Sequence, residues 1–176
     1  MKLFIASDIH GSALYCGKML EAFKHEEAEK IILLGDILYH GPRNDLPEGY
    51  DPKAVIDMFN PLADRILCVR GNCDTEVDQM VLDFGMLSDS ALIFADGITF
   101  TAVHGHRDFP KTAEGSVILS GHTHVPVFER NDGRIRLNPG SVSIPKDGSR
   151  HGYVIYENRT FTFKNLDGEA YREEEI

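Results

Sequence analysis

The sequence of 176 residues contains no apolar run close to the ~18 residues that a membrane-spanning helix requires. Its first apolar stretch, residues 3–6, ends before Asp8, which is too early for a signal peptide. Cysteine is scarce, and Cys16, Cys68 and Cys73 form neither an even set nor a C-x-x-C pair. These absences predict a cytoplasmic protein without a membrane segment, in which Cys16 and Cys68 are buried and apolar in character.

Positive charge is also in short supply, because 18 basic residues face 28 acidic ones and the net charge is −10. Such a balance repels polyanions at long range, and the sequence has no strip rich in basic and aromatic residues. We therefore expect neither a nucleic-acid-binding module nor long nucleic acids as partners. Bound divalent cations would offset the acidic charge only locally.

What is present is an ordinary globular composition, 42% hydrophobic and 26% charged, in a length that suits one domain. We expect this domain to span residues 1–168, followed by a charged and frayed tail over 169–176. The first half alternates strands and helices, whereas the second half contains mostly strands, with no linker between the halves. This pattern predicts an α/β fold with two packed sheets.

Capping signals and apolar runs locate the predicted elements. Ser12 is placed to cap one helix, and Asp51 with Pro52 begins another as N-cap and first-turn proline. Residues 39–50, between these helices, predict a long loop of the kind that is usually functional in a compact domain. Strands are predicted over 2–7, 31–34, 66–69, 92–95, 98–103, 117–119, 125–129, 134–137, 153–156 and 161–163, with hairpin turns at 96–97 and 131–133.

The chain is organised around residues 31–36, where four apolar residues run into Gly35 and Asp36. A continuous apolar run is typical of a strand buried on both faces, and the carboxyl ends of such strands are where open α/β sheets bind ligands. Four further clusters of Asp, His and Asn also follow apolar runs, so we expect all five to meet at one edge. The four are Asp8-Ile9-His10, Gly71-Asn72-Cys73-Asp74, His104-Gly105-His106 and Gly121-His122-Thr123-His124.

Carboxylate, amide and imidazole groups together form a mixed oxygen and nitrogen ligand set that suits Mn²⁺ and other divalent metals. The candidates exceed what one ion needs, so two ions ~3.5–4 Å apart would share them, with Asp36 as the bridge. Adjacent glycines would allow tight turns and close backbone approach. The candidate ligands are Asp8, His10, Asp36, Asn72, His104, His122 and His124.

Each candidate also has an ordinary structural interpretation. Asp8 or Asp36 alone, directly after a strand, is usually a turn residue or a helix N-cap, and Asn72 is a favoured turn residue. His122 and His124 alternate on a stretch that could be a strand, so one of them could simply be buried and hydrogen-bonded. Only the five clusters together favour metal binding.

The ordered motifs Asp-x-His-Gly, Gly-Asp, Gly-Asn-x-Asp, His-Gly-His and Gly-His-Thr-His resemble those of the calcineurin-like metallophosphoesterase superfamily, and the resemblance extends over residues 8–141. Two further regions, residues 40–50 and 138–145, resemble the small bacterial YfcE-type phosphodiesterases. The resemblance implies two mixed β-sheets flanked by helices. It also implies hydrolysis of small phosphodiesters through attack by a metal-bridging hydroxide.

Carried over by position, the resemblance assigns two sets of metal ligands around two divalent ions, for which Mn²⁺ is preferred over Fe, Ni, Zn or Mg²⁺. The candidate catalytic residues are Asp36, Asn72, Cys73 and His106. The first ligand set is Asp8, His10, Asp36 and His124, and the second is Asp36, Asn72, His104 and His122.

Cys73 departs from the wider superfamily, in which many members have a histidine that helps to protonate the leaving oxygen. A thiol with a reference pKa of ~8.5 suits acid catalysis at neutral pH less well than an imidazole near ~6.5. Catalysis would then depend mainly on the metals and favour leaving groups that need little protonation. The role of Asp74, which orients that histidine in such members, stays open.

Several alternatives remain at this point. His106 contacts substrate or the ligand residues, or it lies on the surface; His40 and Arg43, in the long loop, either reach the phosphate or are solvated. A phosphomonoesterase is the nearer rival function, and a non-catalytic scaffold, as in the related retromer subunit, is the other. The complete set of seven ligands favours an enzyme, and a homo-oligomer is compatible with the sequence.

Overall fold

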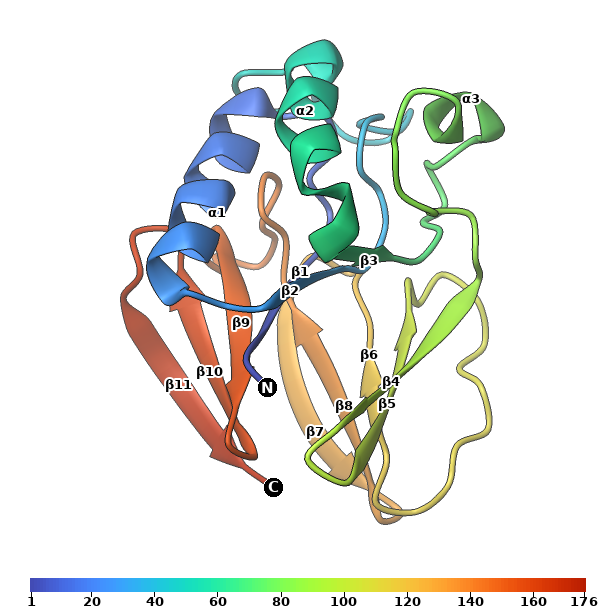
Figure 1. The fold of residues 1–176 in the computed structure, drawn as a ribbon, viewed down its shortest axis with the longest axis vertical. Coiled ribbons are helices and arrows are strands. Elements are labelled where there is room, and N and C mark those ends of the chain that lie inside the picture. Colours follow the sequence, from blue (N-terminus) through green and yellow to red (C-terminus); the bar gives the residue numbers. More distant parts are fainter.

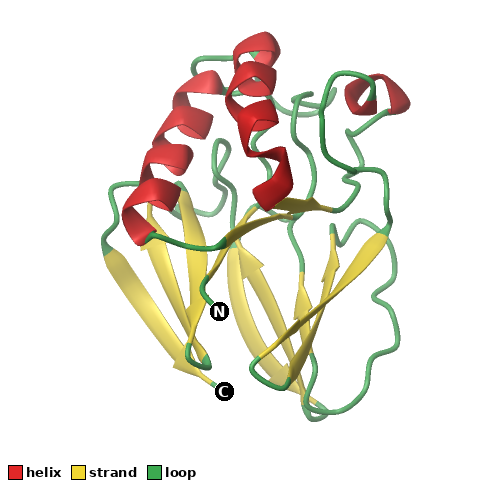
Figure 2. Cartoon of the chain, in the orientation of Figure 1, coloured by secondary structure: helices red, strands yellow, loops and turns green.

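The computed structural model describes residues 1–176 and folds into two β-sheets with three α-helices and one 3₁₀ helix (Figure 1). The two longer helices lie together on one side, and strands dominate the other side (Figure 2). In chain order the elements are β1 (Leu3–Ala6), α1 (Ala13–Glu26), β2 (Lys30–Leu33), α2 (Pro52–Phe59), η1 (Asn60–Arg65), β3 (Ile66–Cys68), α3 (Glu76–Gln79), β4 (Ser90–Ala95), β5 (Ile98–Val103), β6 (Val117–Leu119), β7 (Pro126–Asn131), β8 (Arg134–Pro139), β9 (Gly152–Glu157), β10 (Thr160–Asn165) and β11 (Ala170–Glu175).

Both sheets are mixed. The six-stranded sheet has the order β11-β10-β9-β1-β2-β3, in which β1, β2 and β3 are parallel and the other pairs antiparallel. The five-stranded sheet has the order β4-β5-β6-β8-β7, with three parallel central strands and an antiparallel strand at each edge. The predicted fold of two mixed sheets with flanking helices is therefore confirmed, and so is its βαβαβ beginning.

Alternate residues of β1 face different layers, which explains the continuous apolar runs. Leu3 and Ile5 pack with Phe100 in a core between the two sheets. Phe4 instead faces a second core beneath the helices and stacks on Tyr153, with 4.3 Å between the ring centroids. No helical residue enters the core between the sheets, so the helices cover only the outer face of the six-stranded sheet. Buried on both faces, the central strands give the loops at their ends a rigid base.

The two predicted helix caps are confirmed. The Ser12 hydroxyl oxygen accepts a hydrogen bond from the Tyr15 N–H at 3.2 Å, and the Asp51 carboxylate accepts one from the Ala54 N–H at 3.1 Å. Ser12 also donates to the backbone carbonyl of Glu48 at 2.6 Å, which ties the long loop to the start of α1. None of the helices combines the length and apolar character needed to cross a membrane.

The expectation of a frayed C-terminal tail is wrong. Residues of this segment form β11, which pairs with β10 along its length. Its charges do not prevent pairing, because β11 is an edge strand with one packed face. There the Tyr171 ring lies 6.2 Å from the Phe163 ring, and the Arg172 guanidinium lies 5.4 Å from the centre of the same ring. We infer that β11 belongs to the same domain as residues 1–168.

Glu26, at the end of α1, joins the helix to β9, to β10 and to the residue before β1. Its Oε1 accepts hydrogen bonds from Lys164 Nζ at 2.7 Å and from the Tyr153 hydroxyl at 2.9 Å, and Lys2 Nζ lies 3.3 Å from its Oε2. Burial alone would raise the pKa of Glu26, but Lys164 and Tyr153 outweigh burial and hold it below its ordinary value. The charged form therefore stabilises the folded protein.

Replacing Glu26 with glutamine is expected to reduce the free energy of unfolding at pH 7 by about 2 kcal/mol, the scale of hydrogen bonds to charged groups. Because the folded-state pKa is the lower one, this stabilisation is complete above the unfolded pKa and is lost as the pH falls through the folded pKa. Urea denaturation at pH 7 and pH 3 should show the difference shrinking in acid. Glu21→Gln, at an exposed position of α1, is the control; an equal loss at both pH values would contradict this role of the charge.

Candidate metal centre

The predicted ligand clusters follow five strands whose ends lie at one edge of the paired sheets. Hydrogen bonds connect the loops directly: the N–H groups of Asp8 and His10 donate to the carbonyls of Gly35 and Asp36, and the Gly121 N–H donates to the His104 carbonyl. The structure therefore brings the clusters together as the sequence predicts. Asp8 and His10 follow β1, Asp36 follows β2, Asn72 follows β3, His104 follows β5, and His122 and His124 follow β6.

Five of the seven predicted ligands have a backbone in the left-handed region, which is uncommon outside glycine. Each of them lies in a loop that follows a strand, where the backbone turns sharply. Asp and His tolerate this conformation better than bulky or β-branched residues. The φ angles are 58° at Asp8, 49° at His10, 57° at Asp36, 68° at His122 and 61° at His124.

Two glycines allow the loops to pack this closely. A Cβ atom on Gly71 would lie 2.1 Å from the Asp36 Oδ1 atom, and one on Gly121 would lie 1.9 Å from the Ser7 hydroxyl oxygen. Both distances are far below van der Waals contact, so any other residue would force the loops apart. The expected close backbone approach around the site is confirmed at these positions.

The two carboxylates are arranged in the same way. Asp8 Oδ2 accepts a hydrogen bond from the His122 N–H at 3.0 Å, and Asp36 Oδ1 accepts one from the Cys73 N–H at 2.8 Å. Each carboxylate thus has one oxygen fixed by a backbone donor. Its second oxygen faces the histidines, and both side chains are at most 2% exposed.

Asp8 Oδ1 is the centre of one group of side chains. The Nε2 atoms of His124 and His10 lie 3.3 Å and 3.6 Å from it, and they lie 3.2 Å from each other. Asp36 Oδ2 is 3.7 Å from the Nε2 atom of His10, so it adjoins this group. These four residues are the predicted first ligand set.

Asp36 Oδ2 also adjoins a second group. The Nε2 atom of His104 lies 3.4 Å from Asp36 Oδ2 and 3.1 Å from the Asn72 amide oxygen. The His122 ring centroid lies 5.1 Å from that of His104, and its ring nitrogens lie within 4 Å of neither carboxylate. The predicted second ligand set is therefore assembled on the other side of Asp36, with His122 at its margin.

Three of the imidazoles are oriented by the backbone. The Nδ1 atoms of His10, His104 and His124 lie 2.8, 2.6 and 2.6 Å from the carbonyl oxygens of Tyr39, Leu34 and Ile144. An Nδ1 atom can bond to a carbonyl only as a donor, so its proton is fixed there. Each Nε2 atom then faces the carboxylates and is the ring atom available to a cation, which is how metal-binding histidines are usually held.

The carboxylates make this cluster strongly attractive to cations. Burial alone would lower the pKa of His104, but Asp36 and Asp8 outweigh burial and raise it to about 9. Burial would raise the pKa of Asp8, yet the neighbouring imidazoles of His10 and His124 hold it well below its ordinary value. The raised pKa of His104 reflects the negative charge of the two carboxylates, which a divalent cation would offset in place of protons.

The residues fit a metal. Asp8 Oδ1 is fully buried and accepts no hydrogen bond, although polar atoms of this kind are normally paired. It lies among imidazole nitrogens at distances too long for good hydrogen bonds but suited to ligands around a shared ion. Mixed carboxylate, imidazole and amide donors are the set that Mn²⁺ and similar ions accept.

The predicted catalytic residues differ in their placement. The Cys73 thiol is buried beside Asp36, and burial, with Asp36 adding to it, raises its pKa to about 12. The Asn72 amide nitrogen donates to the Cys73 sulfur at 3.2 Å. His106 lies farther out: its ring centroid is 5.4 Å from that of His104, and burial lowers its pKa. It lines a smaller neighbouring pocket rather than the one at Asp36.

A polar pocket of about 270 Å³ opens over the cluster, and no hydrophobic side chain lines it. Arg43 of the long loop lies at this pocket, whereas His40 does not and instead packs near Tyr39 and Tyr50. Sequence reasoning missed Lys146, for which only its closeness to the 138–145 stretch was a signal. The lining residues are Asp36, Arg43, Asn44, Asn72, His122, Thr123, His124 and Lys146.

The end of β8 and the loop after it support the ligands. The Asn138 amide donates to the Gly121 carbonyl at 2.7 Å and to the Thr123 hydroxyl at 3.0 Å, which holds the turn that carries His122 and His124. The hydroxyls of Ser141 and Ser143 donate to the Asp8 carbonyl at 2.8 and 3.1 Å. This second group of contacts was not predicted.

Asp74, whose role the sequence left open, connects two ligand loops. Its carboxylate accepts hydrogen bonds from the N–H groups of Asp36, Ile37 and Gly71 at 2.8, 2.9 and 2.7 Å. Burial raises its pKa to about 6, although these donors favour the charged form. Asp74 therefore fixes the backbone that positions Asp36.

Replacing Asp74 with alanine is expected to reduce the free energy of unfolding by about 2–4 kcal/mol, because it leaves buried backbone donors without acceptors. Asp57→Ala, at an exposed position of α2, is the control and should change stability by less than about 0.5 kcal/mol. Denaturant unfolding of both metal-free variants makes the comparison. A loss of the control's size at Asp74 would show that the loops hold together without it.

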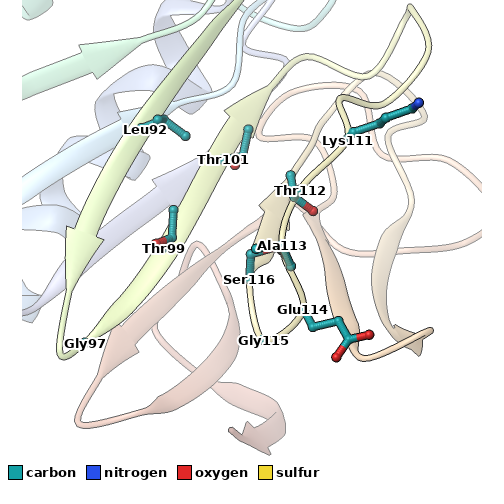
Figure 3. A pocket seen from close by; sticks show the side chains of 10 residues that line it. All are labelled: Leu92, Gly97, Thr99, Thr101, Lys111, Thr112, Ala113, Glu114, Gly115 and Ser116. Atoms are coloured by element: carbon teal, nitrogen blue, oxygen red, sulfur yellow. Dashed lines mark hydrogen bonds between the residues drawn. The ribbon is translucent and has the colours of Figure 1, made fainter.

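A second groove, of about 330 Å³, lies over β4 and β5 beneath residues 111–116 (Figure 3). Its lining includes Thr99, Thr101 and Thr112, and it shares no residue with the polar pocket. One carboxylate and no imidazole or thiol line it, so it offers no set of metal ligands. The groups of three or more side chains that could hold a metal ion lie at the edge described above.

Comparison with known proteins identifies the family. A model of the calcineurin-like phosphoesterase superfamily domain matches residues 1–160. The phosphodiesterase YfcE of Escherichia coli (strain K12) is 43% identical over 174 residues, which cover 97% of this chain and 95% of that protein. The phosphodiesterase MJ0936 of Methanocaldococcus jannaschii is 28% identical over 151 residues, covering 80% and 83%.

Solved structures agree with the sequence relatives. The E. coli phosphoesterase YfcE superposes with a TM-score of 0.96 at 40% identity over the whole of both chains. Vps29 of Entamoeba histolytica, complexed with zinc, superposes with a TM-score of 0.63 at 19% identity, covering 100% and 98%, and shares the fold alone. With five ordered motifs assembled at one edge of two mixed sheets, this chain belongs to the calcineurin-like phosphoesterase superfamily.

Proposed function

We propose that this protein is a metal-dependent phosphodiesterase that hydrolyses small phosphodiesters. The observation that carries the proposal is the Asp36 carboxylate, one oxygen of which lies within 3.7 Å of imidazole nitrogens from two groups, His10 and His104. The superfamily and the phosphodiesterase relative that matches 97% of the chain support the same activity.

Two divalent cations, for which the donor types favour Mn²⁺, would be held at this edge. Asp36 would be shared, while Asn72 and His104 belong to one ion and His10 to the other. When bound, the cations would lower the pKa of water and neutralise charge on the phosphoryl oxygens. The complete proposed sets are Asp8, His10, Asp36 and His124 for the first ion, and Asp36, Asn72, His104 and His122 for the second.

The remaining roles belong to side chains of the chain itself. The backbone carbonyls of Tyr39, Leu34 and Ile144 accept from the imidazole Nδ1 atoms, so Nε2 is the atom of each ring that would bind a cation. No imidazole stands at the position of Cys73, and a buried thiol is a poor acid, so protonation of the leaving oxygen is left to water. We expect the enzyme to prefer diesters with good leaving groups. We propose that His106 acts on the site through His104 and His122, whose ring centroids lie 5.4 and 6.1 Å from its own.

The metal count tests the proposal directly. Purified protein saturated with Mn²⁺ is expected to retain close to two equivalents after desalting, as measured by elemental analysis. Activity on an aryl phosphodiester should disappear with a chelator and return with Mn²⁺. At most one retained ion would contradict the shared role of Asp36, and faster hydrolysis of the matching monoester would favour a phosphomonoesterase.

Substrate size gives a further prediction. The net charge of −10 disfavours long polyanions, so we expect small diesters to be cleaved and duplex DNA to be left intact under the same conditions. The measurement is product formation from an aryl diester beside gel analysis of linear duplex DNA at low and moderate salt. Rapid, salt-sensitive degradation of the DNA would contradict the prediction.

A further inference from the structure

Two basic side chains, Arg43 and Lys146, line the polar pocket over the metal centre, and neither belongs to a ligand motif. Arg43 comes from the long loop before α2 and Lys146 from the loop after β8, more than 100 positions later in the chain. Both side chains line the pocket together with Asp36. Neither forms an ion pair within 4 Å, and neither side chain donates a hydrogen bond within the protein, so both charges are free to meet a ligand.

Both cations sit on loops that are held in place. Lys146 donates its N–H to the His124 carbonyl at 3.3 Å, and its own carbonyl accepts from the Ser149 hydroxyl at 2.6 Å. Next to Arg43 in the chain, the Asn44 amide donates a hydrogen bond to the His40 carbonyl at 2.8 Å, which holds this part of the long loop. These hydrogen bonds hold the backbone from which the two side chains reach the pocket.

The charge of the pocket exceeds what a simple diester needs. A phosphodiester carries one negative charge, and two divalent cations, partly offset by the Asp8 and Asp36 carboxylates, would still supply more positive charge than that. Arg43 and Lys146 are then not required for the scissile phosphate. In a chain of net charge −10, two unpaired cations at one pocket point to a second negative group on the ligand.

The lining also argues against an apolar alcohol. No hydrophobic side chain lines the pocket, so an aromatic or aliphatic group of the substrate would gain no burial there. Charged and hydrogen-bonding groups of the substrate would find partners instead.

We propose that Arg43 and Lys146 select phosphodiesters whose alcohol carries a further negative charge, such as a carboxylate or a second phosphate. This inference rests on the proposed phosphodiesterase function and adds its substrate class. Both residues act as specificity determinants beside the reacting phosphate, and neither is a metal ligand.

Three 4-nitrophenyl phosphodiesters test the inference, differing only in the second alcohol: ethyl, 2-carboxyethyl and 2-(trimethylammonio)ethyl. Exposed ion pairs change binding by up to about fivefold each, so kcat/KM should favour the carboxyethyl ester over the ethyl ester by about five- to twentyfold. The cationic ester should be the poorest substrate. Raising the salt from 20 to 500 mM should reduce these ratios.

The variants are Arg43→Gln, Lys146→Gln and the double variant, with Lys111→Gln as the matched control. Lys111 is an exposed lysine of the groove in Figure 3, outside the polar pocket. Each single change should reduce the preference for the carboxyethyl ester, the double change should remove it, and the control should keep it. Since Arg43 and Lys146 are exposed, thermal melts of all variants should match the wild type.

A binding measurement separates this inference from the proposed function. Calorimetry on the Mn²⁺-loaded wild-type protein should find 2-carboxyethylphosphonate bound about five- to twentyfold more tightly than ethylphosphonate. The double variant should bind the two phosphonates with equal affinity. If no ester is hydrolysed, the proposed function fails, whereas the calorimetric difference still decides the inference. Equal affinities in the wild type, or a preference that survives the double change, would overturn the inference while leaving the diesterase activity intact.

Discussion

Asp36→Ala is expected to lower kcat/KM for a small phosphodiester by about 10³-fold, the upper range for removing one electrostatic element of an active site. His10→Ala should cost less, because it removes a donor from one of the two proposed metal sites. The difference follows from position, because Asp36 Oδ2 adjoins the Nε2 atoms of both His10 and His104, whereas His10 belongs to one group. Elemental analysis should find both metal sites weakened by the first change and one site by the second.

The control for Asp36 must preserve the loop. Its backbone φ of 57° disfavours alanine, and its Oδ1 atom accepts a hydrogen bond from the Cys73 N–H. Asn tolerates this conformation and keeps an acceptor oxygen, so Asp36→Asn separates loss of charge from loss of structure. If Asp36→Asn retains two metal equivalents and His10→Ala loses both, the shared role belongs elsewhere.

Cys73→His is expected to raise kcat/KM for diesters with poor leaving groups, such as alkyl alkoxides, and to change it little for 4-nitrophenolate. A well-placed general acid contributes roughly 10²–10⁴-fold, and an imidazole grafted at this position should capture about tenfold of it. The structure limits the gain, because a Cβ on Gly41 would lie only 2.9 Å from the Cys73 sulfur. An imidazole must therefore push against the long loop or turn towards the pocket.

Cys73→Ser separates the chemistry of the thiol from its size. Because burial raises the pKa of the thiol to about 12, we expect it to take no part as an acid, and serine should cost less than about threefold on the scale of a positioned general acid. The measurement is kcat/KM across diesters of graded leaving-group pKa, with metal content checked for each variant. A hundredfold loss in Cys73→Ser at unchanged metal content would make the thiol a participant.

Local chemistry made much of the fold predictable. Ser12 and Asp51 cap helices because their side chains reach nearby N–H groups, which depends only on adjacent residues. The βαβαβ beginning could be predicted because its strands are continuous apolar runs, and they are continuous because alternate residues face the two cores. The insertion of β9 beside β1 could not be read in the same way, because that pairing joins residues about 150 positions apart.

The misses have physical causes as well. The sequence of the last segment is typical of a charged tail, because an edge strand packs on one face only and its other positions can be charged. In β11 the Tyr171 ring makes such a packing contact. The Asp74 carboxylate accepts hydrogen bonds from the N–H groups of Asp36 and Ile37. Every residue except proline has such an N–H group, so the sequence does not indicate which ones Asp74 will contact. Lys146 belongs to no ligand motif, and only the fold brings it to the pocket beside Arg43.

The left-handed turns at five of the proposed ligands have a consequence for how folding and metal loading are linked. A non-glycine residue in the left-handed conformation costs of order 1–3 kcal/mol, so these five turns together lower the stability of the metal-free protein. Glycine at any one of them would relieve the backbone while deleting a donor atom. A cation that binds only the folded arrangement offsets that cost by mass action. The apparent melting temperature should therefore follow metal availability, and a cell short of the metal would hold a less stable protein rather than only an idle one.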